Sequence, residues 1–131
     1  KKCKNLNLKN SVNFLPPVKN IQEKYKEASM YLMTSRFESF GMILIEAMSF
    51  GVPSICSNLG SMKEVIINNC NGLVFEANNS RDLSRTLLKA TKLSEIERKK
   101  FRKNCFNIFM KKFDSKIMSK KYLKLVNKYE K

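Results

Sequence analysis

A chain of 131 residues is long enough for one domain with one modest core, and its 43% hydrophobic content is typical of a folded protein rather than a disordered one. No apolar run approaches the ~20 residues of a membrane-spanning helix, and the N-terminus lacks the apolar stretch of a signal peptide. Histidine is absent and the four cysteines form no Cys-x-x-Cys pair, which excludes histidine-based nucleophile systems and the common zinc sites. We therefore expect a soluble cytoplasmic protein that uses no metal and no cofactor.

The net charge of +15 is concentrated in the last third of the chain. Residues 81–131 hold 17 Lys or Arg against 5 acids, whereas residues 1–80 hold 9 against 6. One interpretation is an anionic partner, either nucleic acid or an anionic membrane at the inner face of the cell. The other is a set of solvated helix faces, because the basic residues alternate with apolar ones at helical spacing. No zinc-finger, helix-turn-helix or aromatic RNA-binding signature supports a specific nucleic acid.

The first 78 residues predict strands that alternate with helices. The expected elements are a strand at 12–15 closed by two prolines, a short helix through Ile21, Tyr25 and Ala28, a strand at 30–33, a loop at 34–41, a helix at 42–50 ended by Gly51, and a strand at 52–56. After a loop at 57–60, Ser61 and Glu64 predict a capping box that opens a helix through about Asn68. A fourth strand is expected at 72–75.

Residues 79–131 predict three amphipathic helices. The expected N-terminal caps of these helices are Ser80, a capping box formed by Ser94 and Glu97, and Asp114. Their apolar positions are Leu83, Leu87 and Ala90, then Phe101, Cys105, Ile108 and Phe109, then Met118, Tyr122, Leu125 and Tyr129. Together the patterns predict a three-layer α/β fold, with a parallel sheet of about four strands, helices on both faces and a helical C-terminus.

Glu46 is the anomaly in a helix, 42–50, that is apolar nearly all round and is therefore expected to be buried. A buried carboxylate needs either an internal ion pair or backbone cap, or a ligand that offers hydroxyl donors. Position favours the ligand, because parallel sheets bind ligands outside the carboxyl ends of their strands, where the loop 34–41 lies. Free N–H groups near Gly41 suit a phosphate, and Glu46 lies roughly 7 Å further along the helix axis. Glu38 is expected on the opposite side of that phosphate site.

The stretch 35–53 reads SRFESFGMILIEAMSFGVP and resembles the Glu-x7-Glu signature of retaining glycosyltransferases of family 4, which have the GT-B fold. Segments 57–66, 71–75 and 113–129 resemble the same family, so the resemblance runs from about Val12 to the end. The sequence departs from the family at Asn58, Ser61 and Lys63, where Asp, Gly and Pro are frequent.

The resemblance implies a partial nucleotide-sugar-binding domain over residues 1–131, made of a Rossmann-like β/α part at 1–78 and the three helices at 79–131. Glu46 would bind the ribose hydroxyls and Glu38, as the catalytic residue, would bind hydroxyls of the transferred sugar. The remaining donor-binding residues are expected to be Ser39, Phe40, Gly41 and Met42, through backbone N–H groups, and Gly60 and Ser61 in the neighbouring loop.

The reaction that the resemblance implies is retaining transfer of a sugar from a nucleotide-sugar donor, expected to be UDP-linked, to a saccharide or lipid-linked acceptor. It usually proceeds without a metal, because a helix N-terminus and basic side chains stabilise the leaving diphosphate. The family's first two strands of this domain, a basic pair that holds the diphosphate and the acceptor domain are absent from residues 1–131, so the isolated chain is expected to be inactive. A non-catalytic nucleotide-sugar-binding module and a basic nucleic-acid-binding domain are the alternatives. Arg36 has two interpretations. It contacts a phosphate, or its side chain pairs with an acid such as Glu38 or stays solvated.

Overall fold

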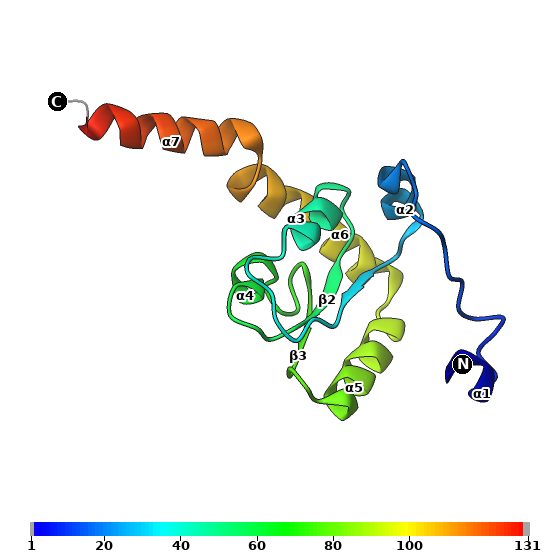
Figure 1. The fold of residues 1–131 in the computed structure, drawn as a ribbon. Coiled ribbons are helices and arrows are strands. Elements are labelled where there is room, and N and C mark those ends of the chain that lie inside the picture. Colours follow the sequence, from blue (N-terminus) through cyan, green and yellow to red (C-terminus); the bar gives the residue numbers. More distant parts are fainter. Residues whose placement is uncertain (1, 130–131) are drawn as a thin grey trace.

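The computed structural model describes residues 2–129 and has a central parallel sheet (Figure 1). The strands β1 (Tyr31–Met33), β2 (Ser54–Ser57) and β3 (Gly72–Phe75) pair in the order β1-β2-β3. In the ladder Tyr31 lies opposite Ser54, and Ser54 lies opposite Gly72. The connections between the strands contain α3 (Met42–Ser49) and α4 (Met62–Val65), as a parallel sheet requires.

Helices cover both faces of the sheet, which confirms the predicted three-layer α/β architecture. On one face Met33 and Cys56 pack against α3, α4 and Cys105 of α6 (Glu95–Lys112). On the other face Ile55, Leu73 and Phe75 pack against α5 (Ser80–Thr91) and the first part of α6. Two short helices, α1 (Lys2–Asn5) and α2 (Ile21–Glu27), precede the sheet, and α7 (Ser115–Tyr129) follows α6.

The predicted strand at 12–15 is wrong, and the sheet has three strands instead of about four. Residues 12–15 make no ladder hydrogen bonds in the structure, and Phe14 is 83% exposed. An alternating segment becomes a strand only beside another strand that accepts and donates its hydrogen bonds. Within residues 2–129 no strand lies next to this segment, so it remains extended and solvated.

Two of the four predicted helix caps are confirmed. Ser94 and Glu97 form the reciprocal capping box of α6, in which the Glu97 carboxylate accepts the Ser94 N–H at 2.8 Å. Asp114 accepts the Lys116 N–H at 2.9 Å at the start of α7. Each of these side chains satisfies an N–H that would otherwise lack a partner in the first turn.

The other two predicted caps are wrong. At α5 the cap is Asn79, whose side chain accepts the Asp82 N–H at 3.0 Å, and Ser80 is already inside the helix. Ser61 makes no side-chain cap, because its own backbone is helical with φ −64° and ψ −28°. An N-cap side chain reaches the next turn only from an extended backbone, and the helix here ends at Val65 rather than near Asn68.

Asn71 and Gly72 form a tightly packed connection between α4 and β3. The buried Asn71 side chain donates to the Val65 carbonyl at 3.0 Å and accepts the Ile67 N–H at 2.7 Å, which holds the end of α4. Gly72 lies so close to β2 that a Cβ on it would stand 2.2 Å from the Ser54 carbonyl oxygen. The spacing of β2 and β3 therefore depends on the missing side chain of Gly72.

Cys56 and Cys105 are free cysteines with no exposed surface. Burial raises the pKa of both thiols to about 12, so they remain protonated at neutral pH. At the C-terminal end α7 extends away from the sheet, on the side opposite α1 (Figure 1).

Candidate functional site

The loop 34–41 connects β1 to α3 at the carboxyl end of the sheet, where ligands of parallel sheets bind. Two hydrogen bonds connect this loop to the end of β2 and to the loop that follows β2. The Ser57 hydroxyl donates to the Ser35 carbonyl at 2.9 Å, and the Ser61 hydroxyl donates to the Glu38 carbonyl at 3.5 Å. The two loops that the sequence assigned to one site therefore lie against each other.

Gly41 is the N-cap of α3 and adopts the left-handed conformation, with φ +78° and ψ 44°. This backbone favours glycine, because a Cβ would crowd the following carbonyl. The added Cβ would also stand 3.2 Å from Leu44 Cδ1 and 3.9 Å from Glu38 Cγ. Glu38 therefore lies beside the first turn of α3.

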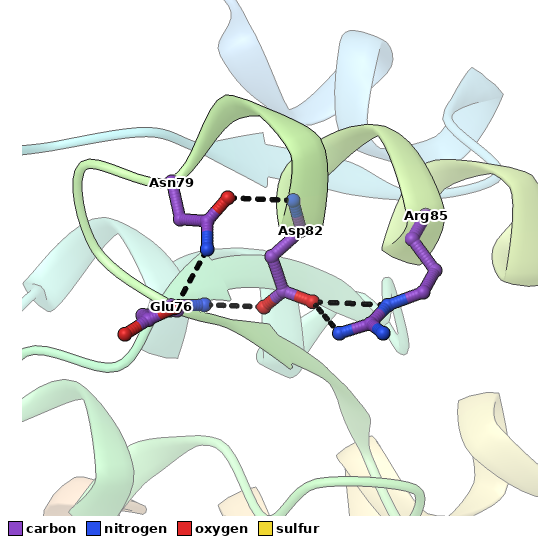
Figure 2. A network of polar contacts seen from close by, with 4 residues as sticks. All are labelled: Glu76, Asn79, Asp82 and Arg85. Atoms are coloured by element: carbon purple, nitrogen blue, oxygen red, sulfur yellow. Dashed lines mark hydrogen bonds and ion pairs between the residues drawn. The ribbon is translucent and has the colours of Figure 1, made fainter.

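The N-terminus of α3 differs from those of the other long helices because no side chain caps it. It has no side-chain cap hydrogen bond and no acid in its first turn. At α5, by contrast, Asn79 accepts the Asp82 N–H, and the Asp82 carboxylate accepts the Glu76 N–H at 2.7 Å and pairs with Arg85 (Figure 2). The Glu76 amide and then Arg85 lower the pKa of Asp82.

In the described part of the chain, α6 and α7 also begin with a side-chain cap, so α3 alone among the helices of eight or more residues starts without one. Free N–H groups at a helix start carry partial positive charge and bind anions such as phosphate. The structure thus leaves the start of α3 without a side-chain cap at the position where the sequence predicted a phosphate site, and the phosphate site itself stays a prediction.

The predicted burial of Glu46 is wrong. α3 buries one side only, formed by Leu44, Ile45, Ala47 and Met48, and Glu46 lies on the exposed side together with Met42 and Ile43. Met42 is 61% exposed. Because Glu46 stays in contact with water, a desolvation penalty does not demand a partner for it. Its case as a ligand-binding group rests on its position and accessibility.

Tyr25 of α2 is a member of this site that the sequence pattern did not reveal. Its hydroxyl donates to Glu46 Oε2 at 3.4 Å. Burial first, and the neighbouring Glu46 second, raise the pKa of Tyr25 to about 12. Burial, followed by Glu38 and Glu46, also raises the pKa of Tyr31, so Tyr31 lies near both carboxylates. The helical spacing identified Tyr25 only as a core residue, and no sequence signal linked it to Glu46.

The predicted site residues fall on three adjoining segments at one edge of the sheet. Gly41 is buried and Glu38 and Ser61 are half-buried, whereas the accessible positions are Ser39, Phe40, Met42, Glu46 and Gly60. Arg36 is exposed and forms no ion pair within residues 2–129, so the pairing with Glu38 that the sequence allowed is absent. Arg36 lines an open pocket of about 380 Å³ together with Ser57 and the start of α5.

Residues 1–107 match the family model described as glycosyl transferases group 1. The chain belongs to this family. Among curated relatives of this group 1 chain, the N-acetyl-alpha-D-glucosaminyl L-malate synthase of Bacillus anthracis is 33% identical over 95 residues, which cover 72% of the chain and 25% of the relative. The group 1 chain thus spans about a quarter of the length of the curated relatives that it matches.

Solved structures confirm the GT-B fold that the sequence predicted. A glycosyltransferase from Rickettsia africae superposes with a TM-score of 0.85 and 25% identity over 94% of this chain and 33% of its own. Anabaena HepE in complex with UDP and glucose superposes with a TM-score of 0.85 over 97% of this chain and 35% of its own. At 21% identity, HepE supports the fold alone.

Proposed function

We propose that this group 1 chain forms part of the donor site of a retaining, family 4 glycosyltransferase that moves a sugar from a UDP-linked donor to a saccharide or lipid-linked acceptor. The observation that carries the proposal is the uncapped start of α3 at Gly41, with Glu38 beside it and Glu46 further along the exposed side. The structural neighbour HepE was solved with UDP and glucose, so we take a UDP-linked sugar as the first donor to test.

Each group has a distinct role in this mechanism. The backbone N–H groups at 39–42 face the diphosphate and stabilise the negative charge that grows on it as the sugar leaves. Glu46 accepts hydrogen bonds from the ribose hydroxyls, and Glu38 accepts them from hydroxyls of the transferred sugar. Gly60 and Ser61 border the sugar, with Ser61 fastened to the Glu38 backbone. Transfer without a metal stays a prediction of the family resemblance.

The experiment that tests the donor site compares nucleotide binding by the wild-type protein at its full natural length and by Glu46→Gln. We expect Glu46→Gln to weaken the affinity for UDP about tenfold, because a hydrogen bond to a charged group contributes about 1.5 kcal/mol or more. Isothermal titration calorimetry with UDP, GDP and ADP measures this loss and identifies the base. The anomeric configuration of the product, observed by NMR, reports retention.

The matched control is Glu95→Gln, which removes the charge of an exposed carboxylate on α6 whose ion-pair partner is Lys99. It should leave the affinity for each nucleotide unchanged. If Glu46→Gln binds all three nucleotides as tightly as the wild type, the ribose role of Glu46 is wrong. If donor binds but no sugar is transferred to any acceptor, the alternative of a non-catalytic nucleotide-sugar module is correct.

We propose in addition that α7 lies on an anionic membrane surface. Its 15 residues contain five lysines and no acid. At 100° per residue the lysines fall on one side, whereas Met118, Tyr122, Leu125 and Tyr129 form a stripe on the other, and each member of that stripe is more than half exposed. A basic, amphipathic helix with an uncovered apolar stripe is typical of helices that lie in the membrane interface. Among residues 2–129 no helix is both long and apolar enough to cross a membrane.

Vesicle co-sedimentation of the full-length protein tests this second proposal. We expect binding to vesicles that contain phosphatidylglycerol and little binding to pure phosphatidylcholine. Replacing Lys120, Lys121 and Lys124 by glutamine should weaken it about a hundredfold, at about 1 kcal/mol for each lysine near the surface. The same change at Lys99, Lys100 and Lys103 of α6 is the control. Equal binding to both lipids, or to neither, would overturn the proposal that α7 lies on an anionic membrane surface.

A further inference from the structure

The hydroxyl of the buried Tyr25 contacts the exposed carboxylate of Glu46. Only 4% of Tyr25 is exposed, and its hydroxyl donates to Glu46 Oε2 at 3.4 Å. Within residues 2–129 no other side-chain donor reaches this carboxylate, so Oε1 is left without a protein partner. Tyr25 thus contacts one carboxylate oxygen of Glu46, and the other has no hydrogen bond within the described residues.

Two aromatic rings fix the position of the Tyr25 hydroxyl. The ring of Phe50, at the end of α3, stacks on the Tyr25 ring with centroids 5.5 Å apart and planes at 14°. The ring of Tyr31 meets it edge-on at 6.3 Å. Phe50 follows Glu46 by four residues, so both lie on the same side of α3, and the stack places the hydroxyl beside the carboxylate.

A fixed donor matters because Glu46 is an exposed, flexible side chain. A glutamate on a helix surface samples several rotamers, and binding a ligand in one of them costs the entropy of the others. A hydroxyl that already selects one rotamer reduces this cost before the ligand arrives. The pKa of about 12 keeps the phenol protonated, so it donates throughout the physiological pH range.

We propose that Tyr25 is a positioning residue of the donor site, whose hydroxyl orients the Glu46 carboxylate to accept the hydroxyls of a nucleoside diphosphate ribose. The inference rests on the proposed function, because Tyr25 acts on the donor only through Glu46. At 3.4 Å the hydrogen bond is longer than the usual value of about 2.7 Å for two oxygens, so a moderate effect is expected.

Tyr25→Phe in the full-length protein tests the role, because it keeps the ring and its stack and removes only the hydroxyl. Titration with UDP, GDP and ADP, each beside its 2′,3′-dideoxy counterpart, separates the ribose contact from the rest of the site. We expect a loss of three- to tenfold in affinity for the ribonucleotide that the wild type binds, and no loss for its dideoxy counterpart. In turnover the donor KM should rise by the same factor while kcat stays within twofold.

Three further variants test whether Tyr25 acts through Glu46. Adding Tyr25→Phe to Glu46→Gln should cost less than twofold, because the hydroxyl then has no carboxylate to orient. Tyr122→Phe, which removes an exposed hydroxyl from α7, is the control and should bind nucleotide like the wild type. Phe50→Leu keeps the Tyr25 hydroxyl but removes its stacking partner and should give a smaller loss that is again confined to the ribonucleotide.

The outcomes separate the two proposals. If Glu46→Gln weakens binding and Tyr25→Phe, with an unchanged melting temperature, does not, Tyr25 has no positioning role and the donor site stands. An equal loss for the ribonucleotide and the dideoxy nucleotide likewise overturns the positioning role. If Glu46→Gln changes nothing, the ribose contact is wrong and the role of Tyr25 is wrong with it.

Discussion

We expect Gly72→Ala to lower the free energy of unfolding by about 3 kcal/mol or more, a large share of the roughly 5–15 kcal/mol that stabilises a domain. The new Cβ would stand 2.2 Å from the Ser54 carbonyl oxygen and 2.8 Å from Ile66 Cγ2. The Ile66 side chain can shift, but Ser54 is the ladder partner of Gly72 in β2. Relief of that clash therefore requires the central strand to move away from β3. Urea denaturation followed by circular dichroism measures the loss.

Gly60→Ala is the control for this effect. A Cβ on Gly60 meets no atom within 4 Å, and its backbone lies outside the left-handed region. It should change the free energy of unfolding by less than about 0.5 kcal/mol. A Gly72→Ala protein with the stability of the wild type would mean that β2 and β3 lie further apart than in the structure.

Gly41→Ala should abolish most of the donor affinity, by about a hundredfold, while it costs only about 1–2 kcal/mol of stability. The stability cost arises from the left-handed backbone at φ +78°. We expect the loss of affinity to be larger, because a change in the left-handed backbone of Gly41 would reorient the first N–H groups of α3, which we propose bind the phosphate. Nucleotide titration and urea denaturation of the same protein measure the two effects separately.

Gly51→Ala is the matched control because it imposes the same kind of strain at the other end of α3. Gly51 has φ +67°, and its Cβ would stand 3.5 Å from the Arg102 carbonyl, far along the chain from the donor loop. We expect a similar loss of stability and a donor affinity within twofold of the wild type. If both glycine variants lose affinity to the same extent, the effect of Gly41→Ala is a consequence of lower stability and not of the site.

Local patterns were sufficient to predict most of the helices. The helices α5, α6 and α7 and the Ser94–Glu97 capping box depend on residues within a few turns of each other, and the structure confirms these elements. The lack of a side-chain cap at the start of α3 is also a local feature. In the sequence it is indicated by Gly41 and by the absence of acids from the first turn.

Features that depend on neighbours in space were predicted wrongly or missed. The segment at 12–15 alternates like a strand but has no partner strand among the described residues. Glu46 sits in an apolar stretch that predicts burial, yet which side of α3 is covered is decided by the sheet and α6, not by composition. The contact between Tyr25 and Glu46 joins residues 21 positions apart, and the close approach at Gly72 joins two strands.

The two buried thiols give this domain a built-in reporter of its own fluctuations. An alkylating reagent attacks the thiolate, and Cys56 and Cys105 are both protonated and enclosed in the native fold. The alkylation rates of Cys56 and Cys105 therefore measure how often the packed layers separate. Cys3 and Cys70, by contrast, are partly accessible in the native fold. Because Cys56 belongs to the central strand and Cys105 to α6, a difference between their rates distinguishes the release of one helix from the opening of the whole sheet.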